Sequence, residues 1–213
     1  MPNALDPFAG KRQQMVQKQI RARGIQDENV LAALRTVPRH EFLPEHLRYR
    51  SYEDSALPLG PGQTVSQPYI VAMMTELARL RPSDRVLEVG TGSGYQAAVL
   101  AELVEELFTI ELDPELAKGA AANLARLGYR RVRCREGNGW HGWPEEAPFD
   151  AILVTACAPE PPTALADQLA EGGRLVVPIG QPGDAQKLVV YEKRGGTLHP
   201  KDSIAVRFVP LVQ

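Results

Sequence analysis

Residues 86–96, "VLEVGTGSGYQ", give the strongest indication of the fold of this chain. Their apolar start predicts a buried β-strand, after which Gly90, Gly92 and Gly94 occupy every second position. Alternating glycines let the backbone turn sharply and let a ligand lie directly against it. A tight strand-to-helix turn that binds nothing would use the same residues. Tyr95 stands where the dinucleotide-binding pattern G-x-G-x-x-G requires its last glycine, so the loop does not predict a nicotinamide site.

The chain after this loop alternates between strand and helix patterns. Helix patterns cover 93–104, 114–128 and 161–173, and strand patterns cover 85–90, 107–112, 131–136, 150–156, 174–180, 187–194 and 203–211. Repeated β-α-β units predict an α/β fold with a mostly parallel, Rossmann-like seven-stranded sheet and helices on both faces. The last two strands have only the turn "GGTLHP" (195–200) between them, which predicts an antiparallel edge.

The residues before the loop predict helices rather than strands. One helix is expected over 12–24 and a second over 27–38, followed by a connection with little periodicity. A third is expected from Ser66, as its N-cap, to Leu80, because apolar residues recur there with helical spacing. We therefore expect one domain over 1–213, with an N-terminal helical extension (1–80) and an α/β core (81–213).

Composition narrows the possible partners of the chain. It has 213 residues, of which 44% are hydrophobic and 23% charged, as in ordinary globular proteins. A net charge of −2 predicts no nucleic-acid partner, and the absence of a long apolar run predicts no membrane span. The two cysteines form neither a disulfide framework nor a metal motif, and the four histidines are scattered, so we expect a cytoplasmic protein without a metal site.

Glu111 gives the glycine loop a chemical context. It ends the second strand of the α/β core, 21 residues after Gly90. In doubly wound sheets an acidic side chain at this place accepts hydrogen bonds from the ribose hydroxyls of a bound nucleoside. Asp113 is also acidic, but its position before Pro114 is typical of a helix start. The loop and Glu111 together predict an adenosine-containing cofactor.

The pattern E-x-G-x-G-x-G, with an acidic end to the next strand, resembles motif I of the class I S-adenosylmethionine-dependent methyltransferases. The resemblance implies S-adenosyl-L-methionine as cofactor and S-adenosyl-L-homocysteine as product. It implies that Glu88 orients the loop backbone or the ammonium group of the cofactor. The cofactor-binding residues implied in this way are Glu88, Gly90, Thr91, Gly92, Gly94, Glu111, Leu112, Asn138 and Gly139.

Five separate stretches narrow this resemblance to one family. They are 62–80 ("GQTVSQPYIVAMMTELARL"), 86–103, 137–156, 161–180 and 206–211 ("VRFVPL"). Together they resemble the protein-L-isoaspartate (D-aspartate) O-methyltransferase family over nearly the whole chain. That family methylates the α-carboxylate of L-isoaspartyl residues in damaged proteins and peptides, and the ester then cyclises to a succinimide whose hydrolysis returns some normal aspartate. Acceptance of D-aspartyl residues is left open by the sequence.

The resemblance also implies where the substrate binds. It assigns Ser66 as the catalytic residue, whose hydroxyl holds the substrate carboxylate towards the methyl donor. Thr64, Val65, Gln67 and Leu57 are expected to bind the substrate around it. A carboxylate is already ionised at neutral pH, so no general base is needed. Isoaspartyl proteins and peptides are the expected partners, and the enzyme is expected to be a monomer.

Two residues depart from the family pattern. Asn138 stands where the family usually has aspartate at the adenine end of the site, and its carbonyl still offers an acceptor. Cys157 replaces a common alanine and is interpreted as a small buried side chain rather than a catalytic thiol. Two alternative functions remain: a class I methyltransferase acting on another, small substrate, and a non-catalytic adenosine-binding module.

Overall fold

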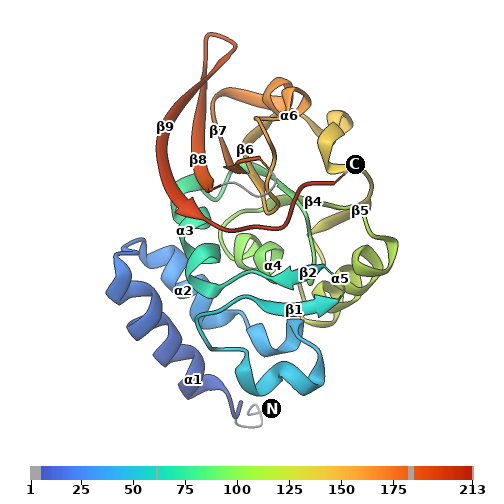
Figure 1. Ribbon diagram of the computed structural model, residues 1–213. Coiled ribbons are helices and arrows are strands. Elements are labelled where there is room, and N and C mark those ends of the chain that lie inside the picture. The colour runs from blue at the N-terminus through green and yellow to red at the C-terminus, as the bar shows by residue number, and fades with distance from the viewer. Residues whose placement is uncertain (1–5, 61, 182–184, 213) are drawn as a thin grey trace.

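The computed structural model describes residues 6–60, 62–181 and 185–212, and its centre is a seven-stranded sheet (Figure 1). The strand order is β5-β4-β3-β6-β7-β8-β9. All neighbours from β5 to β7 are parallel, whereas β8 is antiparallel to both β7 and β9. The predicted Rossmann-like sheet with an antiparallel edge is therefore confirmed. The strands are β3 (Arg85–Val89), β4 (Glu106–Glu111), β5 (Arg133–Glu136), β6 (Phe149–Val154), β7 (Leu169–Ile179), β8 (Gln186–Arg194) and β9 (Thr197–Val206).

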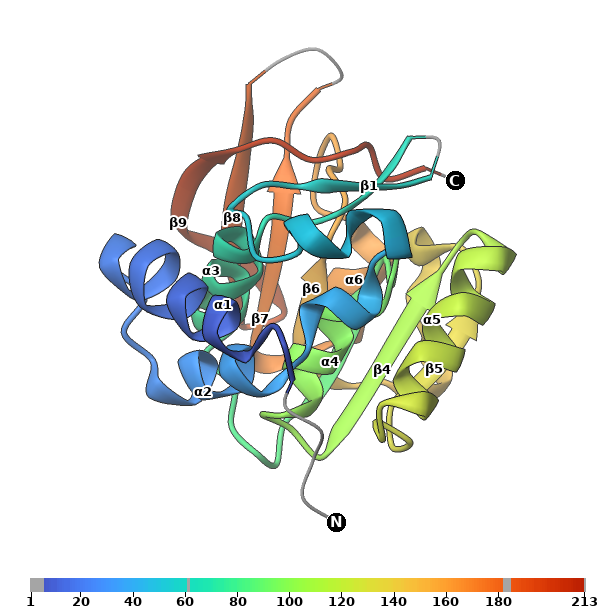
Figure 2. The same ribbon diagram turned by 90° about the horizontal axis from the view of Figure 1, so that it is seen from below.

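Helices and loops cover both faces of this sheet, and each face has its own hydrophobic core. Alternation along β3 places Val86 in one core and Leu87 and Val89 in the other. The first core lies under α2 (Glu28–Thr36), α3 (Pro68–Ala78), α4 (Tyr95–Ala101) and α5 (Pro114–Arg126). The second lies under α6 (Thr163–Gln168) and the loop that carries Trp140 and Trp143. Figure 2 shows the helices on the two sides of the sheet.

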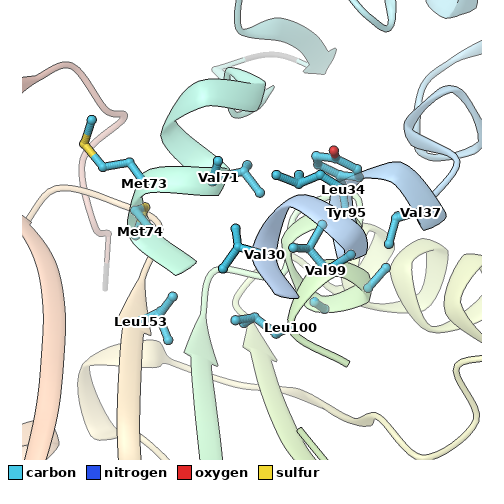
Figure 3. Packing of buried hydrophobic residues seen from close by; sticks show 14 of the residues in the cluster. Val30, Leu34, Val37, Val71, Met73, Met74, Tyr95, Val99, Leu100 and Leu153 are labelled. Atoms are coloured by element: carbon cyan, nitrogen blue, oxygen red, sulfur yellow. The ribbon is translucent and has the colours of Figure 1, made fainter. Parts of the chain in front are cut away.

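The N-terminal part of the chain packs into the first core. Val30 and Leu34 of α2 lie against Val71 of α3 and Val99 of α4 (Figure 3). Met74 of α3 is only 1% exposed, which agrees with a packing role for the methionines of this helix. Because helices from before and after the glycine loop share one core, the N-terminal extension is fixed directly against the sheet.

The N-terminal extension contains more elements than the sequence predicts. The first predicted helix is α1 (Ala9–Gln14), continued by the π-helical η1 (Met15–Ile20) and the 3₁₀ turn η2 (Arg21–Arg23), and Gly24 ends it with φ 104°. The connection after α2 contains the 3₁₀ helices η3 (Arg39–Phe42) and η4 (Glu45–Arg50). It continues into an antiparallel hairpin of β1 (Leu57–Gly60) and β2 (Gln63–Val65), which the weak periodicity does not predict.

Several element ends also differ from prediction. Helix α3 stops at Ala78, because Arg79 adopts a left-handed conformation with φ 52°. Helix α6 is short, because β7 already begins at Leu169. The expected six-residue turn before β9 contains only Gly195 and Gly196, whose φ values of 57° and 76° suit a two-residue hairpin turn. The periodic patterns therefore locate the elements well but do not fix where they end.

Candidate active site

A cavity of about 740 Å³ opens at the carboxyl ends of the central strands. This is the edge where open α/β sheets bind ligands. Most of its wall comes from three parts of the chain: the glycine loop with the end of β4, the segment from β2 into α3, and the C-terminal segment 204–212. Arg23, Ala56, Gly139, Thr155 and Ala156 complete it. Figure 2 shows the C-terminal segment running alongside the β1–β2 hairpin, so these distant parts of the sequence meet at one site.

The glycine loop needs glycine for two different reasons. Gly90 has φ 96°, and a Cβ there would lie 2.4 Å from Thr155 Oγ1. Gly92 has φ 54°, lines the cavity and has open space where its Cβ would be, so a ligand meets bare backbone there. Gly94 also has positive φ, but it does not line the cavity; it begins α4 and allows Leu124 of α5 to pack closely. The expected cofactor contact of Gly94 is thus replaced by a backbone role.

Glu111 ends β4 beside the glycine loop, as the sequence predicts. One carboxylate oxygen accepts the N–H of Gly92 at 2.8 Å, and the other accepts the N–H groups of Leu112 at 2.9 Å and Asp113 at 3.1 Å. These bonds, all within the chain, fix the glycine loop to the end of β4. A carboxylate has about four acceptor positions, so Glu111 keeps capacity for a further donor. Leu112 and Thr91, two of the residues for which cofactor binding is predicted, also line the cavity.

Glu88 lies under the loop rather than in the cavity wall. Its side chain has no exposed surface and accepts a hydrogen bond from Thr109 Oγ1 at 2.5 Å, while Thr109 Oγ1 lies 2.6 Å from Thr91 Oγ1. Its second oxygen, Oε1, has no partner among the described residues. Burial raises the pKa of Glu88 to about 8. Of the two roles expected for Glu88, the geometry fits orientation of the loop, through two threonine hydroxyls.

Ser66 lines the cavity together with Thr64, Val65 and Gln67. The prediction that Ser66 is the N-cap of the following helix is wrong: α3 begins at Pro68, and its N-cap is Gln67. The hydroxyl of Ser66 makes no hydrogen bond with any residue that the structure describes. A polar group without a partner on a cavity wall is available to a ligand.

Two other expected contacts are not brought to the cavity. Leu57 is fully buried on the inward face of β1 and packs in the first core, because alternation along that strand turns it away from the cavity. Asn138 lies at the start of a short 3₁₀ turn, where its side-chain oxygen accepts the N–H of Trp140 at 2.9 Å. Only its neighbour Gly139 lines the cavity, and there a Cβ would lie 2.3 Å from Val89 Cγ1.

The C-terminal segment is a part of the site that the sequence reasoning missed. The backbone of Cys157 donates to Val209 O and accepts from the N–H of Leu211, both at 2.7 Å, so this segment is bound to the loop after β6. The thiol of Cys157 is buried, and burial raises its pKa, which agrees with a packing role. The stretch "VRFVPL" was the available signal, but it served only as a family marker.

The wall of the cavity carries few charges. Among the lining residues that the structure describes, Arg23, Arg207 and Glu111 are the only ones of the charged types Asp, Glu, Lys and Arg. Nowhere in residues 6–60, 62–181 and 185–212 do three or more His, Cys, Asp or Glu side chains form a group that could hold a metal ion. In those same ranges, no helix is long and apolar enough to cross a membrane.

Solved structures of similar proteins share the whole architecture. One, described as a protein-L-isoaspartate O-methyltransferase, matches with a TM-score of 0.85 and 31% identity over 96% of this chain, which spans 66% of that protein. A Plasmodium falciparum protein described as a protein-L-isoaspartate O-methyltransferase, in complex with S-adenosyl-L-homocysteine, matches with a TM-score of 0.82 and 26% identity. It covers 94% of this chain, which in turn spans 98% of it.

Sequence comparisons give the same result at higher identity. A protein-L-isoaspartate O-methyltransferase from a Synechococcus species is 55% identical over 99% of this chain and 89% of its own length. Another from Opitutus terrae is 56% identical over 95% of this chain and 87% of its own length. The model of one family, described as protein-L-isoaspartate(D-aspartate) O-methyltransferase, matches residues 10–213. With this match covering the glycine loop, the Ser66 segment and the C-terminal wall alike, the chain belongs to the protein-L-isoaspartate (D-aspartate) O-methyltransferase family.

Proposed function

We propose that this chain repairs damaged proteins by transferring a methyl group from S-adenosylmethionine to the α-carboxylate of L-isoaspartyl residues. One observation carries the proposal: a single cavity joins the glycine loop and Glu111 to the unpartnered hydroxyl of Ser66. The first pair of features suits an adenosine cofactor, and the hydroxyl suits an oxygen-bearing substrate beside it. Membership of the family supports the same reaction.

The residues present fit the cofactor. The bare backbone at Gly92 lets a flat ligand lie against the cavity floor, and the remaining acceptor capacity of Glu111 suits a ribose hydroxyl. Thr91 and Leu112 would contact the same ligand, since both line the cavity. When bound, S-adenosylmethionine supplies an electrophilic methyl group on its positively charged sulfonium.

The chain itself supplies position rather than proton transfer. Ser66 donates a hydrogen bond to the substrate carboxylate and fixes the direction of its oxygens, while Thr64 and Gln67 line the same wall. The carboxylate is ionised at neutral pH, so it needs no base to become a nucleophile. The positive charge of Arg207 on the cavity wall favours an anionic substrate. Holding reactants in a productive geometry contributes several kcal/mol to such a reaction.

A comparison of two peptides tests this function. They share one sequence and differ only in an isoaspartyl or a normal aspartyl linkage, and each is incubated with the protein and methyl-labelled cofactor. We expect base-labile label in the isoaspartyl peptide alone, and a large loss of turnover in Ser66→Ala with cofactor affinity unchanged by calorimetry. Equal labelling of the two peptides, or no labelling by protein that binds the cofactor, would refute the assignment.

Three further properties complete the proposal. We propose that residues 1–80 supply the substrate side of one domain, since Arg23 and the Ser66 segment line the cavity. We propose a cytoplasmic location, because Cys134 and Cys157 are both free thiols, as is usual in a reducing compartment. We propose a monomer, because the large exposed hydrophobics among the described residues, Tyr49, Ile204 and Val212, are few. Light scattering coupled to size exclusion tests the last point, and a stable dimer would contradict it.

A further inference from the structure

The start of helix α3 offers Ser66 only one amide for capping. A serine that caps a helix accepts a hydrogen bond from the backbone N–H two or three residues further on. For Ser66 those residues are Pro68 and Tyr69. Proline has no N–H, so the Tyr69 amide is the single capping partner within reach.

Another side chain already occupies that amide. The N–H of Tyr69 donates to Oδ1 of Asp54 at 3.3 Å, from a bend just before β1. Asp54 Oδ2 accepts from Arg23, and the backbone oxygen of Asp54 accepts from the side-chain amide of Gln67 at 3.0 Å. Asp54 therefore contacts residues on the C-terminal side of Ser66 through both its side chain and its backbone. A carboxylate at a helix N-terminus is also favoured by the helix dipole.

We propose that Asp54 is a positioning residue: by capping α3 from outside the helix, it keeps the hydroxyl of Ser66 free for the substrate carboxylate. The inference rests on the role proposed above for Ser66. Without Asp54, the Ser66 hydroxyl is an acceptor three residues before the Tyr69 amide, which is the spacing of a capping serine. A side chain occupies one rotamer at a time, so an oxygen drawn over the helix is turned from the cavity.

The position of Asp54 is itself fixed by the N-terminal extension. The guanidinium carbon of Arg23 lies 3.5 Å from the centroid of the Tyr69 ring, and Arg23 is paired with Asp54. The Tyr69 hydroxyl donates to the backbone oxygen of Arg23 at 3.4 Å. Arg23, Asp54 and Tyr69 thus form a closed set of contacts, which connects the first helical segment to the start of α3.

A double-mutant cycle tests the proposal, with kcat/KM for an isoaspartyl peptide as the readout. In the wild-type background Ser66→Ala removes a hydrogen bond to a charged group, and we expect a loss of about tenfold or more. In the Asp54→Ala background the hydroxyl is already engaged, so Ser66→Ala is expected to cost less than about twofold. In the Asp54→Asn background the side-chain oxygen still accepts from Tyr69, so the loss on Ser66→Ala returns to the wild-type factor.

Glu53→Ala is the matched control. Glu53 precedes Asp54, is exposed and pairs with Arg50, away from α3. In that background Ser66→Ala should cost the full factor. Pro68→Ala gives an independent arm if Asp54→Ala does not fold, because it creates a second amide that Ser66 can accept. We expect Pro68→Ala to lower kcat/KM and to shrink the effect of Ser66→Ala.

The outcomes distinguish the role of Asp54 from the role of Ser66. An equal cost of Ser66→Ala in the wild-type, Asp54→Ala and Pro68→Ala backgrounds would overturn the role of Asp54 and leave that of Ser66 intact. No cost of Ser66→Ala in the wild-type background would overturn the role of Ser66 and, with it, this inference. Cofactor affinity, measured by calorimetry, should be the same in all backgrounds, which a general loss of folding would not allow.

Discussion

Replacing Glu88 by glutamine removes the buried carboxyl group beneath the glycine loop while keeping its size. The pKa of this group is raised from 4.5 to about 8, with burial as the largest cause and the charge of Glu111 as a smaller one. In the unfolded chain Glu88 ionises near 4.5, so above that pH folding requires the uptake of a proton. The carboxyl group therefore lowers the free energy of unfolding increasingly between pH 4.5 and 8, and by a constant amount above pH 8.

The size of this effect follows from the two pKa values. One pKa unit corresponds to about 1.4 kcal/mol, so between pH 4.5 and pH 7 the carboxyl group lowers the free energy of unfolding by about 3 kcal/mol. Glutamine does not titrate, and its oxygen can still accept from Thr109. The amide N–H₂ at the position of the unpartnered Oε1 costs about 1–3 kcal/mol, but this cost does not depend on pH.

Urea unfolding of the wild type and of Glu88→Gln, at intervals from pH 4.5 to 8, measures the difference. We expect the stability of the variant relative to the wild type to rise by about 3 kcal/mol between pH 4.5 and pH 7. Cys134, whose pKa is raised to about 11, stays protonated throughout this range. Glu105→Gln is the control, since Glu105 is exposed and its substitution removes a carboxyl group from the surface instead of from the core. A pH-independent difference for Glu88→Gln would refute the assignment of a raised pKa to this group.

Three other substitutions test the site and the fold. Glu111→Ala removes the acceptor of three backbone amides. The affinity for the cofactor, measured by calorimetry, should fall at least about tenfold. A wild-type affinity would contradict the role proposed for Glu111 in cofactor binding. Gly139→Ala places a Cβ 2.3 Å from Val89 Cγ1, so thermal unfolding should show a loss of about 1–3 kcal/mol; an unchanged melting temperature would contradict this. Lys193→Met removes the ammonium group that donates to three backbone carbonyls at the end of α6. Urea unfolding should show that the free energy of unfolding falls by about 1–2 kcal/mol. An unchanged free energy would mean that water replaces these bonds.

The sheet and the cofactor half of the site could be predicted from the sequence for a physical reason. Parallel strands end at one edge of a sheet, so Gly90 and Glu111 had to meet once both strands were recognised. The glycine spacing indicates a sharp backbone turn with positive φ angles, and this does not depend on the neighbouring elements. The strand periodicity was equally local, which is why all seven strands of the main sheet were found.

The substrate half could not be predicted from residues alone. The local sequence predicts that Ser66 caps a helix, whereas in the structure α3 begins at Pro68 and the Tyr69 amide donates to Asp54, twelve residues before Ser66 in the sequence. The family resemblance implies a substrate contact for Leu57, but the direction of its side chain depends on the register of the unpredicted hairpin. The C-terminal wall depends on backbone pairing with Cys157, whereas the stretch 206–211 indicated the family and not this pairing.

The wall of the cavity includes residues as far apart in the sequence as Arg23 and Val212, so it is complete only when distant segments of the chain have come together. A chain emerging from the ribosome presents the glycine loop and Glu111 long before residues 204–212 have been made. Until then it has a sheet edge but no closed cavity. We therefore expect tight cofactor binding only from a completely synthesised chain. Proteolytic removal of the C-terminal segment should abolish activity, although most strands of the sheet lie outside that segment.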